Sequence, residues 1–538
     1  MTDAAPPAET PEPIRPEARG PRGFADRRGP EVAAERRIVR QVSEVYERWG
    51  FEPLETGAFE YADALGKFLP DADRPNEGVF ALQDDDEQWM ALRYDLTAPL
   101  ARFAAQTWET LPKPYRRYAF GPVWRNEKPG PGRFREFVQC DADTVGSDRP
   151  EADAEIIAMA CEGLQAAGLA AGQAVVRVSN RKLFDGLFEA GGVTDPIQRL
   201  TALRAIDKFD RLGWEGVAAL LGEGRLDDSG DYTKGANLPL GVAATIEAFL
   251  GSASEGTRAE TLDAIARSGG LGAAGEAALE ELAGIDRALN AMRVDQATVR
   301  FDPTIVRGLE YYTGAVFEAE LLLDTTDDKG RPVRFGSIGG GGRYDDLVAR
   351  FTGQSTPATG FSFGVSRLAS ALRAAGRAGE AARGPVVVIV FSQDDMQSYL
   401  DAVSELRGAG IAAELYLGRA GMKAQMKYAD RRNAPAVVLL GGDEIAGGQV
   451  TIKVARVTKR PELTAPAFST CAAGMDGGKG APPRATASRA APLWHPDVKK
   501  PAAGDTSQRA FTLSKERTFP PRNASDQRLR LVSAAPFE

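Results

Sequence analysis

The spacing of hydrophobic residues changes several times along the chain, and each change predicts a different element. Ile38, Val42, Val45 and Trp49 recur at helical spacing, and Gly50 follows where such a helix would end. Short apolar and aromatic runs bounded by Gly, Pro and Asp predict strands instead. These runs lie in the segments 51–61, 120–124, 133–141, 299–320 and 335–351. The segment 90–106 is expected to run from a strand into a helix, with Asp95 and Thr97 near the junction, and further helices are expected in 154–168 and 364–376.

Two later segments have their own patterns. From about residue 210 to 295 the chain is rich in Leu, Ala, Gly and Glu with few aromatics, which predicts an inserted helical subdomain. From residue 384 to 454 apolar strand runs alternate with helical segments, and this order predicts a small, mainly parallel sheet. No GxGxxG or GxxxxGK[ST] motif occurs there, so nucleotide binding is not the expected task of this second domain.

The two ends of the chain lack apolar periodicity. Residues 1–22 are rich in Pro, Ala and Glu, and we expect them to be disordered at the start. Residues 455–538 hold 14 Lys and Arg against 7 Asp and Glu, a net charge of +7, which leaves −16 for the rest of a chain with a formal net charge of −9. A disordered basic tail is expected, after a main domain over residues 23–383 and a second domain over 384–454.

The amino-acid composition limits the kinds of functional site that the chain can form. The chain has 538 residues, 43% of them hydrophobic, and its three cysteines are far apart without a CxxC pair, so neither a disulfide framework nor a zinc site is indicated. No apolar run of about 18 residues and no signal peptide is visible, which predicts a soluble cytoplasmic protein with no membrane contact. The single histidine, His495, excludes histidine-based triads. The chemistry must therefore rest on Arg, Asp, Glu, Tyr and a metal-bound nucleotide.

The segment FGPVWRNEKPGPGRFREFVQCD reads as a hairpin with arginines on both arms. Arg125 ends the first arm, and Arg133 and Arg135 lie on the second. Each arginine alone is compatible with a solvated strand face. Together with Phe137, whose ring offers a stacking plane for a base, they indicate phosphate binding by guanidinium forks. An arginine hairpin without a Walker lysine suggests ATP held against an antiparallel sheet.

Three further segments contribute candidate ligand groups. In RGLEYYTGAVFE, Arg307 precedes a strand on which Tyr311 and Tyr312 would face opposite sides, one in the core and one toward a ligand. In GSIGGGGRYDD, four consecutive glycines indicate either a flexible loop or the close approach of a ligand or backbone. In GFSFGVSRL, Arg367 lies near a helix N-terminus, where phosphates bind favourably.

These segments together resemble the class II aminoacyl-tRNA synthetases, and among them the histidyl-tRNA synthetase family. The arginine hairpin is similar to motif 2, GFSFGVSRL to motif 3, and LRYDLTAPLAR to the substrate loop. RGLEYYTGAVFE and GSIGGGGRYDDLV resemble the two histidine-specific signatures, and the resemblance covers about residues 20–453. It implies an α+β fold, namely a class II catalytic core on an antiparallel sheet with a helical insertion, followed by a small α/β anticodon-binding domain, and a homodimer.

The resemblance also implies a reaction and a set of site residues. L-histidine would attack ATP to give histidyl-adenylate, and tRNA(His) would then accept the histidyl group. Mg²⁺ would be bound mainly through ATP phosphates, without predicted protein ligands. Arg307 and Arg125 are the implied catalytic residues; Arg125, Arg133, Phe137 and Arg367 would bind ATP; and Asp95, Leu96, Thr97, Gln139, Asp143, Tyr311 and Tyr312 would bind histidine.

Three departures from the family pattern affect these expectations. Gly57 stands where motif 1 usually has proline, at a strand that lines the dimer interface in the family. Ser366 replaces the glutamate before the motif 3 arginine. After Val454 the resemblance to the anticodon-binding domain ends, as if an extension or a shifted reading frame replaced its closing helix.

Two other functions stay open at this point. The first is a synthetase-like, histidine-binding regulatory subunit of histidine biosynthesis, although such subunits generally lack both the catalytic arginine and the anticodon domain. The second is a core that forms adenylate but charges tRNA poorly.

The tail yields the first prediction. Because residues 455–538 lack apolar periodicity, a truncation near Val454 should retain histidine-dependent pyrophosphate exchange, and limited proteolysis should remove the tail first. Loss of exchange in the truncated protein would contradict this expectation.

The hairpin tip yields the second prediction. In the resembled family this loop reaches the tRNA acceptor end, but Gly130-Pro131-Gly132 offers no side-chain donors to a base edge. Lys128 would contact phosphate without reading sequence. We therefore expect little dependence on the extra 5′ guanosine that many members read, as measured by charging transcripts with and without it. A loss of about 100-fold or more on its removal, about 2.7 kcal/mol, would refute the argument.

Overall fold

The computed structural model describes residues 16–65, 78–129, 134–226, 230–252, 256–308, 311–325, 330–333, 335–377 and 384–454. The expectations for the tail, for the hairpin tip and for Arg133 lie outside them.

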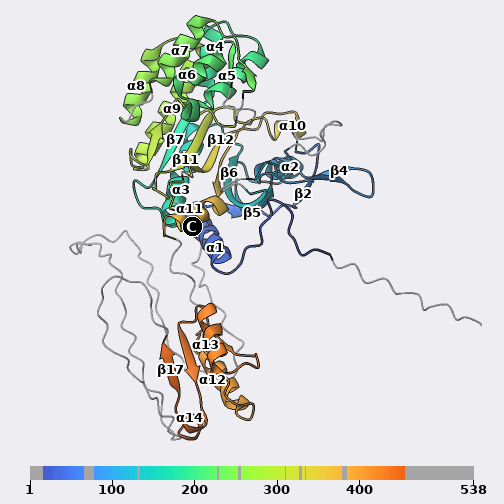
Figure 1. The fold of residues 1–538 in the computed structure, drawn as a ribbon. Coiled ribbons are helices and arrows are strands. Elements are labelled where there is room, and N and C mark those ends of the chain that lie inside the picture. The colour runs from blue at the N-terminus through green and yellow to red at the C-terminus, as the bar shows by residue number, and fades with distance from the viewer. Residues whose placement is uncertain are drawn as a thin grey trace, which may run out of the picture. The chain divides into compact units, whose positions relative to one another are not determined.

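An eight-stranded sheet forms the centre of the first part of the chain (Figure 1). From β5 to β7 every neighbouring pair is antiparallel, whereas the two edge strands run parallel to their neighbours. The expected antiparallel core is thus confirmed for the inner six strands. In spatial order the strands are β1 (Glu52–Pro53), β5 (Tyr115–Trp124), β6 (Glu136–Val145), β13 (Ala358–Gly364), β12 (Ser337–Arg343), β11 (Ala315–Leu321), β7 (Ala174–Asn180) and β10 (Val299–Phe301).

The predicted arginine hairpin is confirmed as the pair β5 and β6, with Arg117 opposite Asp143 and Trp124 opposite Glu136. Both arms extend farther from the tip than the apolar runs suggested. The extension arises because buried side chains such as Tyr115 and Val145 continue the two-residue alternation there.

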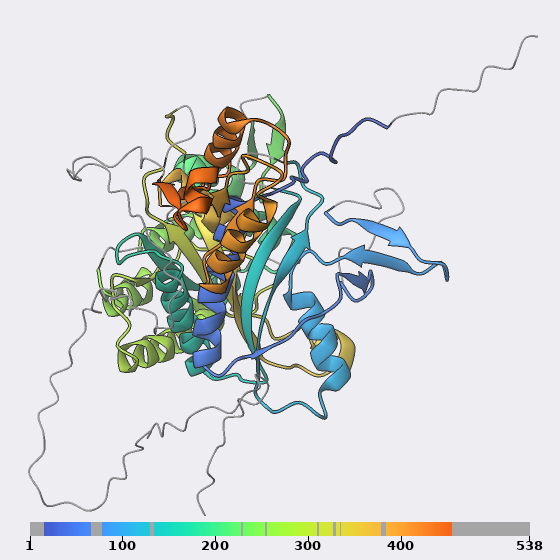
Figure 2. The ribbon, with the colours of Figure 1, turned by 90° about the horizontal axis from the view of Figure 1, so that it is seen from below.

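The alternation gives the sheet two different faces. Cys140, Ala142, Phe361 and Phe363 belong to the apolar face and are fully or nearly fully buried. The helices α1 (Pro30–Arg48), α3 (Pro150–Ala166) and α11 (Val365–Ala374) contact this side, and α1 lies alongside the sheet in both views (Figures 1 and 2). Burial of one large apolar side chain such as Phe363 contributes about 1.5–3 kcal/mol, so this face holds the core. The opposite face carries polar residues.

Close helix packing supports this core. A Cβ atom on Gly163 would lie 2.9 Å from the Phe363 ring, so the absence of a side chain lets α3 approach the sheet. In the same way a Cβ on Gly186 would lie 1.8 Å from the Leu271 carbonyl oxygen, where α4 (Lys182–Ala190) meets α9 (Gly272–Ala291).

The helical subdomain, which extends from α4 to α9, lies next to the end of the sheet that contains β7 (Figure 1). It begins at Lys182, upstream of the change in composition near residue 210, and Arg258 fixes part of it through a buried ion pair of 2.6 Å with Asp286. Its other elements are α5 (Pro196–Ile206), α6 (Phe209–Leu221), β8 (Gly224–Leu226), β9 (Tyr232–Lys234), α7 (Leu240–Leu250) and α8 (Arg258–Ser268).

Smaller elements flank the sheet near the hairpin. A three-stranded antiparallel sheet consists of β2 (Phe59–Tyr61), β4 (Trp89–Leu92) and β3 (Ala81–Gln83). The chain then enters α2 (Thr97–Thr107), which contacts α10 (Ala349–Thr352).

Residues 384–454 form their own four-stranded sheet. β14 pairs in parallel with β15 and β16, and β17 pairs antiparallel with β16, so the expectation of a mainly parallel sheet is confirmed. The elements are β14 (Val386–Val388), α12 (Met396–Gly408), β15 (Ala413–Leu415), α13 (Met422–Arg431), β16 (Ala436–Leu439), α14 (Gly442–Ala446) and β17 (Thr451–Val454).

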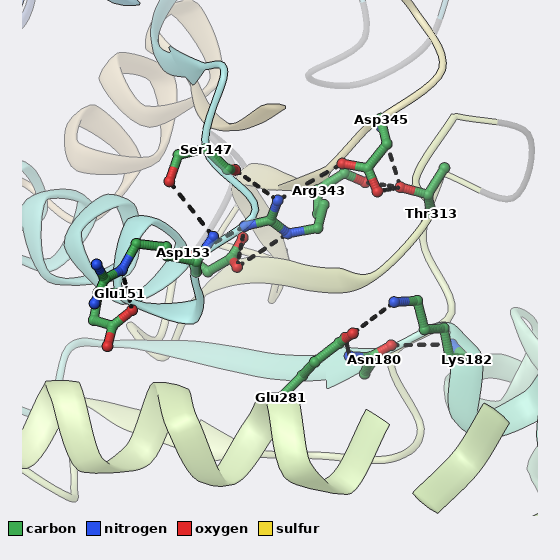
Figure 3. A network of polar contacts seen from close by, with 10 residues as sticks. Ser147, Glu151, Asp153, Asn180, Lys182, Glu281, Thr313, Arg343 and Asp345 are labelled. Carbon is green, nitrogen blue, oxygen red and sulfur yellow. Dashed lines mark hydrogen bonds and ion pairs between the residues drawn. The ribbon is translucent and has the colours of Figure 1, made fainter. Parts of the chain in front are cut away.

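A buried polar network ties β12 to the beginning of α3 (Figure 3). The Arg343 guanidinium pairs with Asp153 at 2.6 Å and donates to the backbone carbonyl of Ser147 at 2.9 Å. Next to it, the Thr313 hydroxyl donates to Asp345 at 2.8 Å. Because both partners of the Arg343–Asp153 pair are almost fully buried, removing one of them leaves an unpaired charge in the interior.

Replacement of one partner therefore provides a stability test. Asp153→Asn should lower the free energy of unfolding by about 3–5 kcal/mol, because the buried Arg343 loses its counter-ion while the side-chain volume is kept. Urea unfolding followed by circular dichroism would measure this loss of stability. Glu151→Gln is the matched control on the same helix, since its pairing with Arg149 is solvent-exposed and should hardly matter. Equal midpoints for the two variants would contradict the role of the network.

Candidate active site

The polar face of the sheet holds several of the predicted site residues. Gln139, Asp141 and Asp143 alternate along β6 and share this face with Arg117 of β5. Their neighbours across β13 and β12 are small: Gly360 pairs with Asp143, Ser362 with Asp141, and Gly342 with Gly360. The centre of the face therefore combines charged groups with very little side-chain bulk.

The Arg117–Asp143 ion pair is the most buried feature of this face. The two groups are 2.9 Å apart, with 0% and 3% of their side chains exposed. Arg117 also donates to the Leu96 carbonyl at 2.8 Å, and the Tyr344 hydroxyl donates to the other Asp143 oxygen. Burial raises the pKa of Asp143, and the nearby Arg117 opposes this rise. The pair thus links β5, β6, β12 and the segment before α2.

Asp95 lies at the N-terminus of α2 and accepts hydrogen bonds from two backbone amides, Thr97 at 3.1 Å and Ala98 at 2.9 Å. The Tyr311 hydroxyl donates to its other oxygen at 3.3 Å. Burial raises the pKa of Asp95, while the amides and Arg125 lower it. The helix N-terminus favours the ionised carboxylate, so Asp95 can receive a cationic ligand group.

Arg125 and Gln139 lie at the hairpin. The Arg125 guanidinium is 5.2 Å from the centre of the Phe137 ring, and its Nε donates to the Tyr94 carbonyl at 3.1 Å. Gln139 donates through Nε2 to Ser362 at 2.8 Å, which leaves its buried Oε1 without a hydrogen-bond partner in the described structure. Arg135, which lies near the tip on the second arm, donates to the backbone carbonyl of Glu127 at 3.0 Å and so connects the two arms.

The structure corrects the expected arrangement of the two tyrosines. Tyr311 and Tyr312 do not lie on a strand with opposite orientations, because β11 begins only at Ala315. The turn at Gly308, which has a φ of 60°, brings their rings into a T-shaped contact with centroids 5.4 Å apart. Burial raises the pKa of Tyr312, followed by the effect of Asp143. Both tyrosines therefore belong to the same site.

The four glycines lie in β12 and not in a flexible loop. A Cβ on Gly341 would be 2.1 Å from the Gly360 carbonyl oxygen, and a Cβ on Gly342 would be 2.9 Å from the Tyr312 ring. Close approach of backbone and of a site tyrosine therefore explains these two glycines.

Arg307 and Arg367 belong to different elements: Arg307 precedes β11, and Arg367 lies in α11. Arg307 forms a two-fold hydrogen bond with the buried Glu318 of β11, at 3.0 and 2.8 Å, and half of its side chain is exposed. Arg367 donates to the Phe335 carbonyl. Ser366 accepts a hydrogen bond from the Val138 amide at 3.0 Å, so this departure from the family pattern still connects α11 to β6.

Sequence reasoning missed four residues of this face: Arg117, Asp141, Glu318 and Tyr344. For Asp141 a signal existed, since acidic residues alternate with apolar ones in an otherwise buried strand. For Arg117 and Tyr344 no local pattern exists, because each meets Asp143 only when separate segments come together. Glu318 lies only 11 residues after its partner Arg307, in the same segment RGLEYYTGAVFE, so a pair of opposite charges was visible there.

The antiparallel sheet, the arginine hairpin and the acidic face together define a class II aminoacyl-tRNA synthetase. The family model described as Histidyl-tRNA synthetase matches residues 23–368, and the one described as Anticodon binding domain matches residues 385–466, past the expected domain end at Val454. The chain belongs to the histidyl-tRNA synthetase family.

Known relatives agree with this assignment. The chain is 71% identical to the histidine–tRNA ligase of Caulobacter vibrioides over 82% of this chain and 89% of that protein. It is 55% identical to the histidine–tRNA ligase of Rhodopseudomonas palustris over 83% and 90% of the two chains. The crystal structure of histidyl-tRNA synthetase from a Nostoc species is similar with a TM-score of 0.64 at 27% identity, covering 82% of this chain and 95% of that one.

Proposed function

We propose that this protein is a histidine–tRNA ligase, which attaches L-histidine to tRNA(His) by way of a histidyl-adenylate. The observation that carries the proposal is the 71% identity to a histidine–tRNA ligase across the catalytic and anticodon-binding parts of the chain. The acidic face of the sheet supports it, because a free amino acid with a cationic ammonium group needs buried acceptors.

In this proposal the histidine ammonium binds near Asp95 and Gln139, with Leu96 and Thr97 next to Asp95 at the start of α2. The side chain of histidine extends toward the part of the face occupied by Asp143 and Tyr312, and Tyr311 holds Asp95 in place through its hydroxyl group. The unpartnered Oε1 of Gln139 supports this placement, since a buried acceptor without a donor is costly unless a ligand supplies one.

ATP would bind along the hairpin, with Arg125 and Arg367 on its phosphates, Phe137 beside the base, and Arg133 as a further phosphate contact. Arg307 would stabilise the negative charge that develops on the α-phosphate as histidine attacks. Within the described residues no cluster of acidic, cysteine or histidine side chains is arranged to hold a metal ion. The proposal assigns Mg²⁺ mainly to the phosphate oxygens of ATP, because this small cation prefers oxygen ligands and commonly bridges substrate phosphates.

The remaining assignments follow from the same family. We propose a homodimer that acts in the cytoplasm. No helix in the described part of the chain is long and apolar enough to cross a membrane. The alternative of a regulatory subunit is not favoured, because the anticodon-binding match and Arg307 are both present.

Two assays test the function directly. Histidine-dependent exchange of pyrophosphate into ATP measures adenylate formation, and charging of tRNA(His) measures the complete reaction. We expect both activities in the full chain. Histidine binding without exchange would support the regulatory alternative, and exchange without charging would identify a core that lacks effective tRNA recognition.

The role of Arg307 gives a specific prediction. Arg307→Ala should lower the adenylation rate by roughly 10²–10³-fold, because charge stabilisation is lost mainly in the transition state. Pre-steady-state adenylate formation would measure this change. Arg373→Ala is a control with an arginine on α11 that is ion-paired with the exposed Glu31, and it should leave the rate unchanged.

The Glu318 contact modifies the expected stability of this variant. Arg307→Ala leaves the buried Glu318 carboxylate unpaired, so the variant should also be less stable than the wild-type protein. The double variant Arg307→Ala with Glu318→Gln removes that charge. If the double variant recovers stability and still forms adenylate slowly, the defect is catalytic. A near-normal adenylation rate in either variant would contradict the proposed catalytic role of Arg307.

A further inference from the structure

Residues 20–28, which we call the N-terminal segment, precede α1 and contact the second arm of the arginine hairpin. The backbone N–H of Arg135 donates to the Gly23 carbonyl at 3.0 Å. The Arg135 carbonyl in turn accepts a hydrogen bond from the Arg125 N–H at 2.9 Å. A chain of backbone hydrogen bonds therefore connects Gly23 with Arg125, the arginine that the proposed function places on the ATP phosphates.

The hairpin needs support at this point because the sheet narrows toward the tip. β13 pairs with β6 as far as Gly364, which lies opposite Gln139. Beyond that pair, the described arms continue toward the tip paired with each other, as far as Trp124 and Glu136. A two-stranded hairpin alone is at best marginally stable in water. The N-terminal segment supplies a further backbone partner for the second arm, nearer the tip than the end of β13.

Two features hold the N-terminal segment against this arm. The Phe24 ring makes a T-shaped contact with the Phe80 ring, with centroids 5.5 Å apart, and the Arg135 guanidinium lies 5.9 Å from the centre of the same Phe80 ring. Gly23 has a φ of 87°, and a Cβ atom there would lie 2.8 Å from the Arg135 Cδ. Glycine, which has no side chain, accommodates both the turn and this close approach.

Arg27 connects the same segment to α11. Its guanidinium forms an ion pair with Glu35 of α1 and donates to the Ser366 hydroxyl at 3.4 Å. The Ser366 hydroxyl also accepts a hydrogen bond from the Val138 N–H of β6 at 3.0 Å. Because Arg367 follows Ser366 in α11, the N-terminal segment contacts the elements that carry both arginines proposed to bind the ATP phosphates.

We propose that the N-terminal segment positions the arginines that bind ATP, and that Gly23 and Phe24 are its positioning residues for Arg125. The proposal rests on the proposed function, because it gives this segment a part in the use of ATP. In this role Gly23 and Phe24 do not contact the nucleotide. They act through Phe80 and Arg135, which hold the second arm in place, and the Arg135 carbonyl in turn holds the backbone of Arg125.

The proposal predicts an effect on ATP that histidine does not share. The carboxylate of Asp95, which is proposed to meet the histidine ammonium, is held by the first amides of α2. Gln139, the other proposed partner of the ammonium, donates to Ser362 of β13 inside the sheet. Neither contact involves the N-terminal segment. A shift of that segment should therefore weaken ATP binding and leave histidine binding nearly unchanged.

A contribution to stability alone is the main alternative. The Phe24 and Phe80 rings are only half-buried, so their contact adds little to the core. A purely stabilising contact would lower the unfolding midpoint and leave the kinetics of the folded protein unchanged. The two roles are therefore distinguished by the KM for each substrate, measured at a temperature where every variant is folded.

The first test compares Gly23→Ala with Gly29→Ala by histidine-dependent pyrophosphate exchange. Both glycines have a positive φ, 87° and 54°, so both substitutions strain the backbone. A Cβ at Gly29 meets nothing within 4 Å, whereas one at Gly23 meets the Arg135 side chain. For Gly23→Ala we expect the KM for ATP to rise about 10-fold or more, as for a weakened hydrogen bond to a charged group, with the KM for histidine within about two-fold of the wild-type value. Gly29→Ala should leave both values unchanged.

Phe24→Ala provides the test if Gly23→Ala fails to fold. It removes the ring that contacts Phe80 and adds no strain to the backbone. We expect the KM for ATP to rise roughly 3- to 10-fold, the range of one aromatic pair, with the KM for histidine again unchanged. Phe24→Tyr, which keeps the ring, should restore the wild-type value.

The outcomes separate this proposal from the function on which it rests. Wild-type protein without histidine-dependent exchange would refute the proposed function. With an active wild-type protein, the proposal would be overturned if Gly23→Ala had the same KM for ATP as Gly29→Ala, or if its KM rose equally for both substrates. If Gly23→Ala does not fold, a normal KM for ATP in Phe24→Ala would lead to the same conclusion.

Discussion

The ion pair between Arg117 and Asp143 fixes how β5 and β6 lie against each other, and the polar face of the sheet depends on that register. A slip of one residue would turn Gln139, Asp141 and Asp143 into the helix-covered core and expose the apolar residues between them. Desolvation of both charges is costly, so the pair persists only with good geometry and additional hydrogen bonds. The contacts to Leu96 and Tyr344 supply these bonds and connect the pair to the segment before α2 and to β12.

Charges on this face are held in place by other parts of the protein before any substrate binds. Asp95 is fixed by the first amides of α2, Arg125 by a backbone carbonyl and the Phe137 ring, and Arg307 by Glu318. Groups held in this way need little reorganisation when charge develops in a reaction, which is the physical basis of electrostatic catalysis. The Glu318 contact also means that Arg307 exchanges one anionic partner for another if it meets a phosphate.

Much of the fold followed from sequence because periodicity is a local property. The helix at Ile38 to Trp49, the arms of the arginine hairpin and the alternating elements after residue 384 were all visible as spacing. The tyrosine pair was placed wrongly because a turn at Gly308, and not a strand, sets the two rings. Arg117 and Tyr344 were missed because each meets Asp143 only after distant segments come together. Local spacing carries no information about such contacts.

The small residues at the centre of the sheet limit how this site can change. A Cβ on Gly360 would lie 1.9 Å from an Asp143 oxygen, and one on its neighbour Gly342 would lie 2.6 Å from the Ala315 carbonyl oxygen and 2.9 Å from the Tyr312 ring. Even alanine at either position would force the strands or the ion pair to move. The centre of the polar face therefore does not tolerate gradual substitution. A change of specificity toward another amino-acid substrate, by evolution or by engineering, would therefore have to begin at residues around this centre. Those residues already carry side chains, which can be replaced one at a time.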